Sequence, residues 1–277
     1  MQWQEVLQNK REKKEITLIK KDSKSTEPGT ALVTGGAKRI GASISKHLAK
    51  SGWNVIIHFK TNQKAALQLR SKIIKTGGSA EIIKADLSKE KHVKDLIPKI
   101  KEKYEDLSLL INNASIFEKD NVSKLKEYDW NRHIEINVKA PLFLSKYFYD
   151  SLSKNESGVI VNIVDQGVLN NRPDFISYYA SKNCLWYLTK TLAQAFSPKV
   201  RVCALGPGPT LKNSRQTNND FIKQIQSLPL RKGPDLKEIN KAVDFIIFSY
   251  SFTGQMITLD GGEHLKWEVK KGKIYKE

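Results

Sequence analysis

A tyrosine and a lysine four residues apart, Tyr178 and Lys182, are the leading candidates for chemistry in this sequence. They lie within a helical pattern, and residues at this spacing share one face of a helix. A phenol can donate a proton, but its ordinary pKa of about 10 makes it a slow donor near neutral pH. A neighbouring ammonium group stabilises the phenolate and lowers that pKa. The pair therefore indicates general acid catalysis, and a chance pair on a helix surface is the alternative.

Further polar positions are expected to join this pair. Asp165 follows one apolar run, Asn112–Ser115 follows another, and Asn137 lies in the long helical pattern between them. If the runs are parallel strands, their carboxyl ends meet at one edge of a sheet, where nucleotide-binding folds hold their ligands. We therefore expect these side chains to gather there with Tyr178 and Lys182.

A glycine-rich turn, Thr34–Gly41, follows the first apolar run and opens the first helical pattern. Glycine lets the backbone approach a pyrophosphate, and a helix N-terminus offers unpaired N–H groups and the positive end of a dipole. A tight turn without a ligand is the alternative. Because strand, turn and helix occur in this order, we expect a dinucleotide to be bound by Thr34, Gly35, Lys38, Arg39, Ile40 and Gly41.

The end of the second apolar run indicates which dinucleotide is bound. It reads His58-Phe59-Lys60, and we expect these three residues to contact the cofactor. No Asp or Glu stands where NAD enzymes hold the ribose 2′-hydroxyl group. Lys60, with Lys38 and Arg39, would attract a 2′-phosphate, so NADPH is favoured over NADH. After the third run come Asp86 and Leu87, where Asp86 is a candidate acceptor for the adenine amino group or a helix cap.

The elements that must position these residues alternate along the chain. Continuous apolar runs bounded by Gly, Asn or Asp are typical of strands buried on both faces. We expect strands at Ala31–Val33, Val55–Phe59, Ala80–Lys84, Leu107–Ile111, Gly158–Val164, Val200–Leu205 and Met256–Leu259. We expect helices at Arg39–Ser51, Gln63–Thr76, Lys89–Tyr104, Trp130–Ser153, Ile176–Phe196 and Leu236–Phe248. The alternation predicts a single α/β domain of Rossmann type, with a parallel sheet covered by helices on both sides.

The remaining segments complete the domain organisation. Residues 1–28 are charged and lack a sustained helical stripe, so we expect a loosely ordered extension before a reductase domain at 29–265. Residues 266–277 form a basic C-terminal tail. The polar stretch 207–238 holds a weak helical pattern and is too long for an ordinary connection. We expect it to be a lid over the substrate.

Composition excludes several classes of protein. No apolar run approaches the roughly 20 residues that a membrane-spanning helix needs. The N-terminus also lacks the apolar stretch of a secretory signal, so we expect a cytoplasmic protein with no membrane partner. Cys184 and Cys203 lie in apolar surroundings without metal-binding spacing, which predicts buried free thiols and neither a disulfide nor a metal site.

The formal net charge of +18 has one local concentration. Lysines are spread along the whole chain, whereas a nucleic-acid binder gathers its charge in a stripe or tail, so no nucleic-acid partner is expected. Between Glu27 and Glu81, however, nine Lys or Arg residues and no acid occur, which is half of the net charge. Such a positive segment suits a ligand rich in phosphate.

Jointly the motifs are specific for one family. From about Thr30 to Leu265 the chain resembles the short-chain dehydrogenase/reductases, on the motifs Thr34–Gly41, Asp86, Asn112–Ala114, Asn137, Tyr178 with Lys182, Pro207-Gly208 and Asp260-Gly261-Gly262. The resemblance implies a doubly wound, seven-stranded sheet, often in a homotetramer, with Asn137, Tyr178 and Lys182 as catalytic residues. It also implies cofactor contacts at Asn113, Ala114, Lys182, Pro207 and Gly208.

Two departures from the family pattern resemble a narrower group. Asp165 replaces the usual Ser thirteen residues before the Tyr, and Arg39 replaces the middle Gly of the phosphate turn. Both are similar to pteridine reductases and bacterial dihydromonapterin reductases. This resemblance implies a pterin that stacks on Phe117 and contacts Ser115, Arg39, Asp165 and Tyr178. A carboxyl group suits a pterin because it accepts from N–H donors and can relay protons to ring nitrogens. Packing beneath a loop is the alternative role for Phe117.

Two other functions fit parts of the sequence. A 3-oxoacyl-carrier-protein reductase of the same family would suit the basic surface, because the carrier is acidic, but those enzymes normally keep the Ser that Asp165 replaces. A non-catalytic protein that binds nucleotide or nucleic acid is disfavoured by the set Asn137, Tyr178 and Lys182. We therefore expect an NADPH-dependent pterin reductase with Tyr178 as proton donor. Dihydrobiopterin, dihydromonapterin, dihydrofolate and quinonoid substrates all remain open.

Overall fold

The computed structural model describes residues 28–170 and 172–266. The extension predicted at 1–28 and the basic tail predicted at 266–277 therefore lie, except for Pro28 and Lys266, outside the described residues. Within the two described ranges, no helix has both the length and the apolar character needed to cross a bilayer.

A seven-stranded sheet of parallel strands forms the centre of the fold. The strands are β1 (Thr30–Val33), β2 (Asn54–Phe59), β3 (Ser79–Lys84), β4 (Leu107–Asn112), β5 (Gly158–Ile163), β6 (Val200–Pro207) and β7 (Met256–Leu259). Their order is β3-β2-β1-β4-β5-β6-β7, so the chain winds from the centre to one edge and then to the other. This confirms the doubly wound Rossmann-type sheet, whose strand order reverses between β1 and β4.

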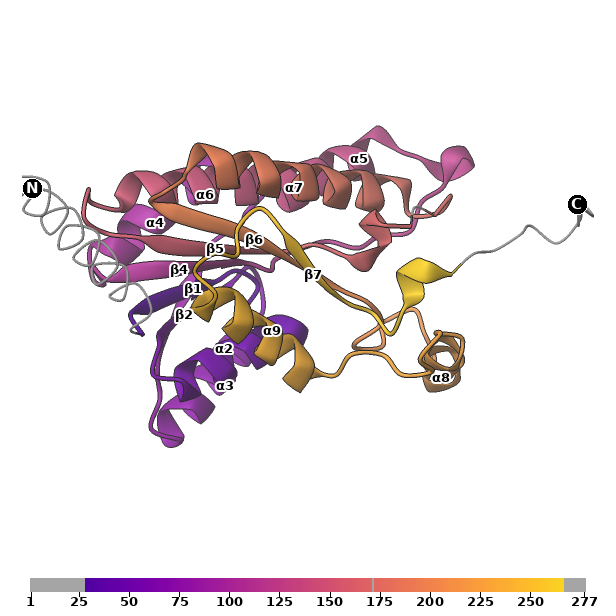
Figure 1. Ribbon diagram of the computed structural model, residues 1–277, viewed down its shortest axis with the longest axis horizontal. Helices are drawn as coiled ribbons and strands as arrows, with labels where there is room; N and C mark the ends of the chain where they lie inside the picture. The colour runs from indigo at the N-terminus through magenta and orange to yellow at the C-terminus, as the bar shows by residue number, and fades with distance from the viewer. Residues whose placement is uncertain (1–27, 171, 267–277) are drawn as a thin grey trace, which may run out of the picture.

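Helices cover both faces of the sheet (Figure 1). One layer holds α2 (Arg39–Lys50), α3 (Gln63–Lys75) and α9 (Leu236–Phe248), and the other holds α4 (Glu90–Lys101), α6 (Ala140–Ser151) and α7 (Ile176–Ala195). Side chains of β1 alternate between the two layers, because Ala31 and Val33 belong to the core beneath α2 and Leu32 to the core beneath α4 and α6. Burial on both faces explains why the strands are continuous apolar runs.

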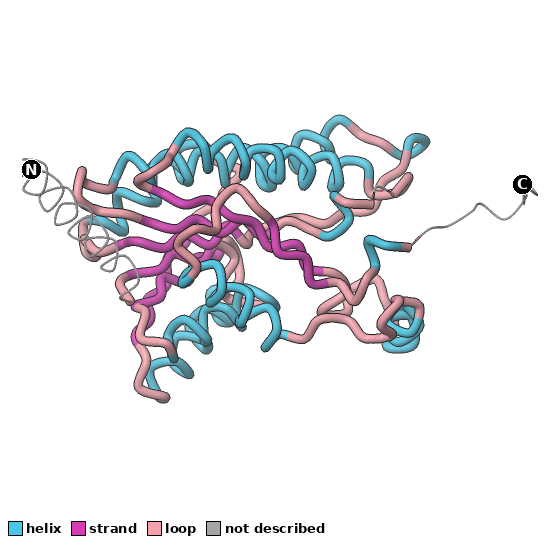
Figure 2. The backbone as a smooth tube through the Cα atoms, in the orientation of Figure 1, coloured by secondary structure: helices cyan, strands magenta, loops and turns pink. Residues whose placement is uncertain are grey.

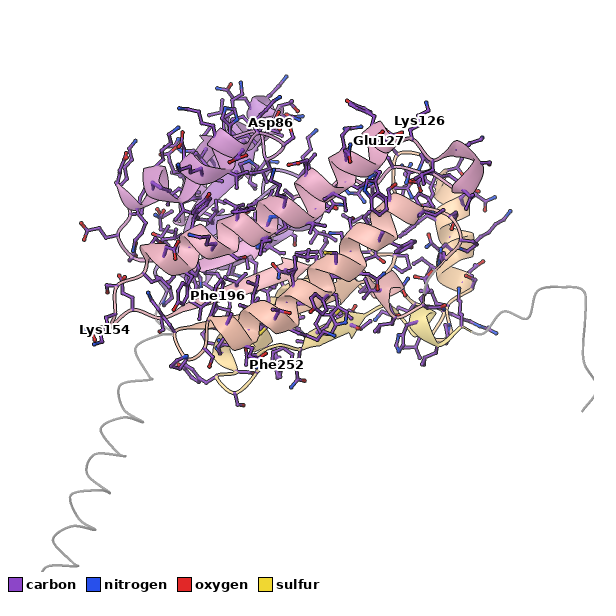
Figure 3. The ribbon with its side chains drawn as sticks, turned by 90° about the horizontal axis from the view of Figure 1, so that it is seen from above. Asp86, Lys126, Glu127, Lys154, Phe196 and Phe252 are labelled. Atoms are coloured by element: carbon purple, nitrogen blue, oxygen red, sulfur yellow. The ribbon has the colours of Figure 1, made fainter. Side chains whose placement is uncertain are left out.

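The helical stretch predicted at Trp130–Ser153 is not one regular helix. It begins earlier, as α5 (Glu127–Ile134), passes through a π-helical turn at Glu135–Lys139, and continues as α6. A π turn inserts an extra residue into the helix and is frequent at functional sites. Asn137 lies within this turn. Figure 3 looks onto this layer and shows the α5–α6 path running beside α7.

The segment predicted as a lid, 207–238, leaves β6 and returns at α9. Figure 2 shows it as loop except for one helix, α8 (Asn218–Gln226), which the weak helical pattern had indicated. Thr217 and Asp220 form a capping box at the start of α8. In Figure 1 this segment lies beyond the carboxyl ends of the strands. Its movement stays a prediction.

The two cysteines differ in exposure. Both are free thiols, and Cys203 on β6 is buried, as the sequence predicted. Cys184 on α7 is only partly buried. The prediction of a buried thiol is wrong there, because an apolar stretch on a helix that covers a sheet still turns one face outward.

Candidate active site

A cleft of about 1050 Å³ opens where β1, β4, β5 and β6 end. This is the place where the strand order reverses, at which open α/β sheets bind ligands. Three predicted site residues, Thr34, Phe59 and Asn137, do not line it. The others do: Gly35, Lys38, Arg39, Ile40, Gly41, His58, Lys60, Asp86, Leu87, Asn113, Ala114, Ser115, Phe117, Asp165, Tyr178, Lys182, Pro207 and Gly208.

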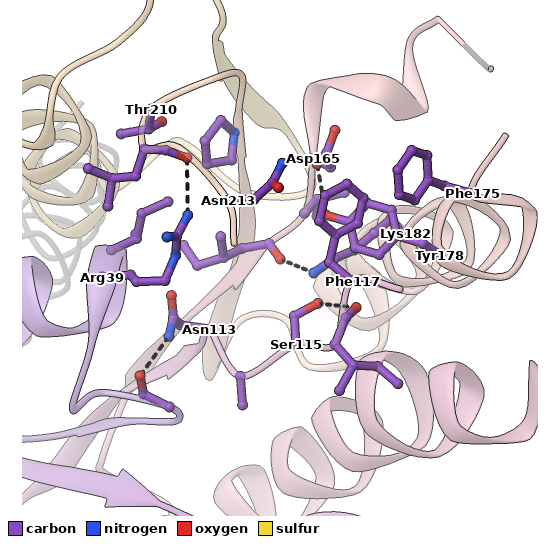
Figure 4. Close-up of a pocket in the computed structure, with 18 of the residues that line it drawn as sticks. Arg39, Asn113, Ser115, Phe117, Asp165, Phe175, Tyr178, Lys182, Thr210 and Asn213 are labelled. Atoms are coloured by element: carbon purple, nitrogen blue, oxygen red, sulfur yellow. Dashed lines mark hydrogen bonds between the residues drawn. The ribbon is translucent and has the colours of Figure 1, made fainter. Parts of the chain in front are cut away.

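At the centre of the cleft, Tyr178 and Asp165 are hydrogen-bonded to each other (Figure 4). The Tyr178 hydroxyl donates to Asp165 Oδ2 over 2.8 Å, and the Gly167 N–H donates to Asp165 Oδ1 over 2.8 Å. Lys182, one turn further along α7, donates through Nζ to the Ile163 carbonyl oxygen at 2.8 Å. Its Nζ lies 5.8 Å from the centroid of the Tyr178 ring. The end of β5 and the first turns of α7 thus bring these three side chains together.

Burial dominates the electrostatics of this group. It raises the pKa of the Asp165 carboxyl, although hydrogen bonds from Gly167 and Tyr178 oppose the rise. Burial and the adjacent Asp165 carboxylate raise the pKa of Tyr178 well above its ordinary value. Burial lowers the pKa of Lys182 to about 8, while Asp165 opposes that shift.

The prediction that Lys182 lowers the pKa of Tyr178 is therefore wrong for this arrangement. The ammonium of Lys182 donates to a backbone carbonyl, and the phenol faces a carboxyl group instead of a cation. Tyr178 consequently holds its proton firmly. Burial raises the pKa of Asp165 from its ordinary value, which makes this carboxyl the better candidate for proton exchange.

Asn137 lies behind the cleft and supports its wall. Its amide Nδ2 donates to the Ile116 carbonyl and to Ser181 Oγ, each at 3.0 Å. Its Oδ1 accepts from the Ile116 N–H at 2.9 Å and from Ser115 Oγ at 3.1 Å. The side chain is 1% exposed, so all of its hydrogen bonds serve the protein. Asn137 thus connects Ser115 and Ile116 to α7.

Phe117 lines the cleft and also packs on other aromatic rings, and its predicted contact with a pterin stays a prediction. Its ring stacks on Phe175 with 4.6 Å between centroids and 20° between planes. It also lies 4.5 Å from the Tyr178 ring. Phe175 was not among the predicted site residues, although its position three residues before Tyr178 places it on the same side of the helix start.

The phosphate turn is shaped by glycines and by the chain beneath it. Gly35 has φ +59°, and a Cβ on Gly41 would lie 2.5 Å from both Asn113 Nδ2 and the Gly35 oxygen. Thr34 Oγ1 accepts the backbone N–H groups of Asn113 and Ala114, at 2.9 and 3.0 Å, which ties β1 to β4. The first turn of α2 has no side-chain cap and no acidic residue. An anion can therefore approach that helix end.

His58 and Phe59 support this turn from the protein side. The Gly35 N–H donates to His58 Nδ1 at 3.0 Å, so His58 Nε2 carries the hydrogen that is donated to the Ala85 carbonyl at 3.1 Å. Burial lowers the pKa of His58 to about 4, which keeps the ring neutral. Phe59 is 5% exposed and belongs to the core. Both ring nitrogens of His58 are thus occupied by backbone groups, and Phe59 does not reach the cleft.

Lys60 and Asp86, predicted to contact different parts of the cofactor, form an ion pair. Lys60 Nζ lies 3.0 Å from Asp86 Oδ1, which also accepts from the N–H and the hydroxyl of Ser88. Partial burial opposes ionisation of Asp86, but these bonds outweigh it and lower the pKa. The alternative role of Asp86 as a helix cap is not realised, because Lys89 is the residue before α4.

Arg39 adopts the conformation of the glycine that it replaces. Its φ of 53° lies in the left-handed region, which explains why the family pattern has glycine there. Its guanidinium donates to the Leu211 carbonyl at 3.1 Å (Figure 4) and to the Lys212 carbonyl at 2.8 Å. Arg39 therefore connects the phosphate turn to the segment 207–238.

A polar cluster around the buried Glu263, which the sequence did not reveal, lines another part of the cleft. Glu263 is 4% exposed, pairs with Arg172 at 2.6 Å, and accepts from Gln166 Nε2 at 3.0 Å. All three line the cleft, as does Tyr179. Glu263 follows the Asp260-Gly261-Gly262 motif directly, and this proximity was the only indication available in the sequence.

Comparisons with known proteins agree with this geometry. The sequence model of the short chain dehydrogenase family matches residues 29–223. The solved structure of FolM alternative dihydrofolate reductase 1 from Brucella canis, complexed with NADP, is 40% identical, with a TM-score of 0.85 over 89% of this chain and 98% of that chain. Its Brucella suis counterpart, also with NADP, is 40% identical, with a TM-score of 0.84 over 88% and 98%. A 3-oxoacyl-[acyl-carrier-protein] reductase FabG from Staphylococcus epidermidis is 27% identical over 85% of this chain and 99% of its own.

Proposed function

The chain belongs to the short-chain dehydrogenase family of oxidoreductases, and we propose that it is an NADPH-dependent reductase of a pterin-type substrate. The observation that carries the proposal is the hydrogen bond between Tyr178 and Asp165, at the position where the family pattern has a serine. A buried carboxyl group in this place can exchange a proton with a ring nitrogen. A serine hydroxyl, with its far higher pKa, is a much weaker acid.

The residues of the chain supply the proton chemistry of such a reduction. When bound, NADPH supplies the hydride that is added to the carbon of a C=N bond, and the nitrogen then needs a proton. Burial raises the pKa of the Asp165 carboxyl, which favours its protonated form relative to an exposed aspartate. Tyr178, which is hydrogen-bonded to that carboxyl, can give its hydroxyl proton to the substrate and take the Asp165 proton in its place. Lys182 is charged at neutral pH and stabilises negative charge that develops beside it.

The phosphate end of the cleft fits NADPH. The uncapped start of α2, Gly35 and Gly41 leave room and N–H donors for a pyrophosphate. Lys38 and Arg39 stand at this turn, and Lys60 stands beside it. The one acid at this end, Asp86, is already paired with Lys60. A 2′-phosphate therefore meets net positive charge. Both Brucella structures contain NADP, which supports the same choice.

Phe117 and the Brucella relatives support the pterin-type substrate. The Phe117 ring forms part of the cleft wall beside Tyr178, where a flat conjugated ring can stack on it. The 40% identical relatives are named dihydrofolate reductases. The segment 207–238 covers the cleft as a lid, and the enzyme works in the cytoplasm as a homotetramer. Static light scattering checks the tetramer.

One assay tests the function. NADPH oxidation is followed spectrophotometrically with dihydrobiopterin, dihydromonapterin, dihydrofolate, a quinonoid dihydropterin and an acetoacetyl thioester. A pterin reductase should turn over at least one pterin with a kcat/KM far above that of the thioester. Failure with every pterin would refute the proposal.

The second candidate function is reduction of a 3-oxoacyl carrier-protein thioester. The naming of the Staphylococcus epidermidis relative favours it, and so does the positive net charge, because the carrier is acidic. The same panel separates the two functions. Preference for the acetoacetyl thioester over every pterin would establish this candidate instead.

A further inference from the structure

An arginine of the segment 207–238 lies over the aromatic wall of the cleft. The guanidinium carbon of Arg215 is 4.6 Å from the centroid of the Phe117 ring and 5.4 Å from that of Phe175. Arg215 Nη1 also donates to the Phe117 carbonyl oxygen at 2.9 Å. All three residues line the cleft. One side chain thus holds both the backbone and the ring of Phe117 from the side of the lid.

Phe175 is also held in place by its own backbone contacts. Its φ of 59° is unusual for a residue with a side chain, and such strain persists only where the surroundings enforce it. The Phe175 N–H donates to the Asp120 carbonyl at 2.8 Å. The Asp120 carboxylate, 5% exposed, accepts from the N–H and the hydroxyl of Ser177 at the start of α7. The aromatic pair is therefore fixed to the helix that carries Tyr178.

The contacts of Arg215 depend on a flat cation. A guanidinium group stacks on aromatic faces and donates in fixed directions, whereas a lysine ammonium is a compact point charge. A conjugated ring that enters the cleft needs the Phe117 ring in a fixed plane. A flexible acyl chain has no such need. An interaction that fixes Phe117 therefore favours flat substrates over aliphatic ones.

We propose that Arg215 determines substrate specificity, because it lies against Phe117 and Phe175 and thereby holds the aromatic wall in position for a flat conjugated ring. This inference rests on the proposed function. Arg215 acts through Phe117, so it is a positioning residue. Its effect should appear in the KM for a pterin and not in the chemical step.

The experiment compares Arg215→Ala, Arg215→Lys and a matched control, Arg70→Ala, which removes an arginine of α3 that does not line the cleft. With the preferred pterin, KM should rise about tenfold in Arg215→Ala, since an exposed cation–π contact and one hydrogen bond are lost. In Arg215→Ala, the kcat with the pterin and the dissociation constant for NADPH should stay within about twofold of wild type. The kcat/KM for the acetoacetyl thioester should also stay within about twofold. Arg215→Lys should resemble Arg215→Ala, and Arg70→Ala should resemble wild type.

Several outcomes would overturn the role of Arg215. They are an unchanged pterin KM in Arg215→Ala, full rescue by lysine, or an equal loss with the thioester. Weaker NADPH binding in Arg215→Ala would also count against it, because the lid as a whole would then be disturbed. If wild type reduces no pterin, the proposed function fails first. If wild type reduces a pterin and Arg215→Ala has the wild-type KM, only this inference fails.

Discussion

Replacing Asp165 by Asn removes a charge and an exchangeable proton while keeping the shape of the side chain. In the structure, one carboxylate oxygen accepts from Gly167 N–H and the other from the Tyr178 hydroxyl, each at 2.8 Å. The Asn carbonyl can keep the bond to Gly167. Its NH₂ group cannot accept from Tyr178, so the phenol must turn or change its partner.

The expected loss has two parts. A hydrogen bond to a charged group contributes about 1.5–3 kcal/mol, so pterin binding should weaken about ten- to hundredfold if the substrate uses this carboxyl. General acid catalysis is typically worth about 10²–10⁴-fold, so kcat should fall by a similar factor when the proton source is lost. Both changes are measured by NADPH oxidation with the preferred pterin.

The pH dependence provides a separate check. Burial raises the pKa of Asp165, so its acid form is present below that pKa and is lost as pH rises through it. Wild-type kcat should fall over that range, and the Asn variant should lack this step. The folded protein also holds this proton more tightly than the unfolded chain. The free energy of unfolding of the wild type should therefore decline as pH rises from the ordinary aspartate pKa to the raised pKa of Asp165. The Asn variant should lack this pH-dependent decline.

Asp165→Ser serves as the control because it restores the usual family residue. A pterin reductase should lose pterin turnover in both variants, whereas a ketone reductase should tolerate or gain from serine. If Asp165 only caps the turn through Gly167, then Asn should substitute almost freely. Wild-type pterin kinetics in Asp165→Asn would end the case for a catalytic carboxyl group.

Three further predictions concern the donor, the cofactor and the lid. Tyr178→Phe should lower kcat by about 10²–10⁴-fold with NADPH binding nearly unchanged. Tyr187→Phe, on the exposed face of α7, should leave kcat unchanged. If Tyr178→Phe retained most of the rate, the donor role of Tyr178 would be refuted. The kcat/KM for NADPH should exceed that for NADH by well over tenfold, since two or three charge-assisted contacts of about 1.5–3 kcal/mol at most are available to the 2′-phosphate. Arg39→Ala should lower this ratio, and equal kcat/KM values with both cofactors would contradict the prediction. Proteolysis within residues 210–230 should slow when NADPH and a pterin are both present, and unchanged cleavage would count against closure.

The sequence by itself predicted the helices and strands, because burial requires a recognisable pattern of apolar residues within each of them. Strands covered on both faces must be apolar throughout, so runs such as Val55–Phe59 are recognisable without their neighbours. The glycine turn is recognisable for a similar reason, since Gly35 and Gly41 occupy positions that other residues would strain or obstruct. The spacing of Tyr178 and Lys182 likewise records one helix face.

The sequence near a residue did not predict roles that depend on a partner from a distant part of the chain. The sequence of β2 predicted His58 and Lys60 as cofactor contacts, which stay predictions. It did not reveal that the His58 ring is hydrogen-bonded to Gly35 and Ala85, or that Lys60 pairs with Asp86. In each case the partner comes from another strand end. Only the parallel sheet, which gathers these ends at one edge, decides which groups meet.

The electrostatics of the site were decided by tertiary structure alone. The sequence predicted that Lys182 would lower the pKa of Tyr178, yet burial and Asp165 raise it. Arg215 and Phe175, forty residues apart, meet over Phe117 only because the chain after β6 folds back across the start of α7. Helix and strand propensities act over a few residues, whereas burial and charge pairing depend on which segments are neighbours in space. Sequence patterns therefore predicted the helices and strands and the residue types of the site. The packing of those helices and strands determined which side chains of the site contact one another.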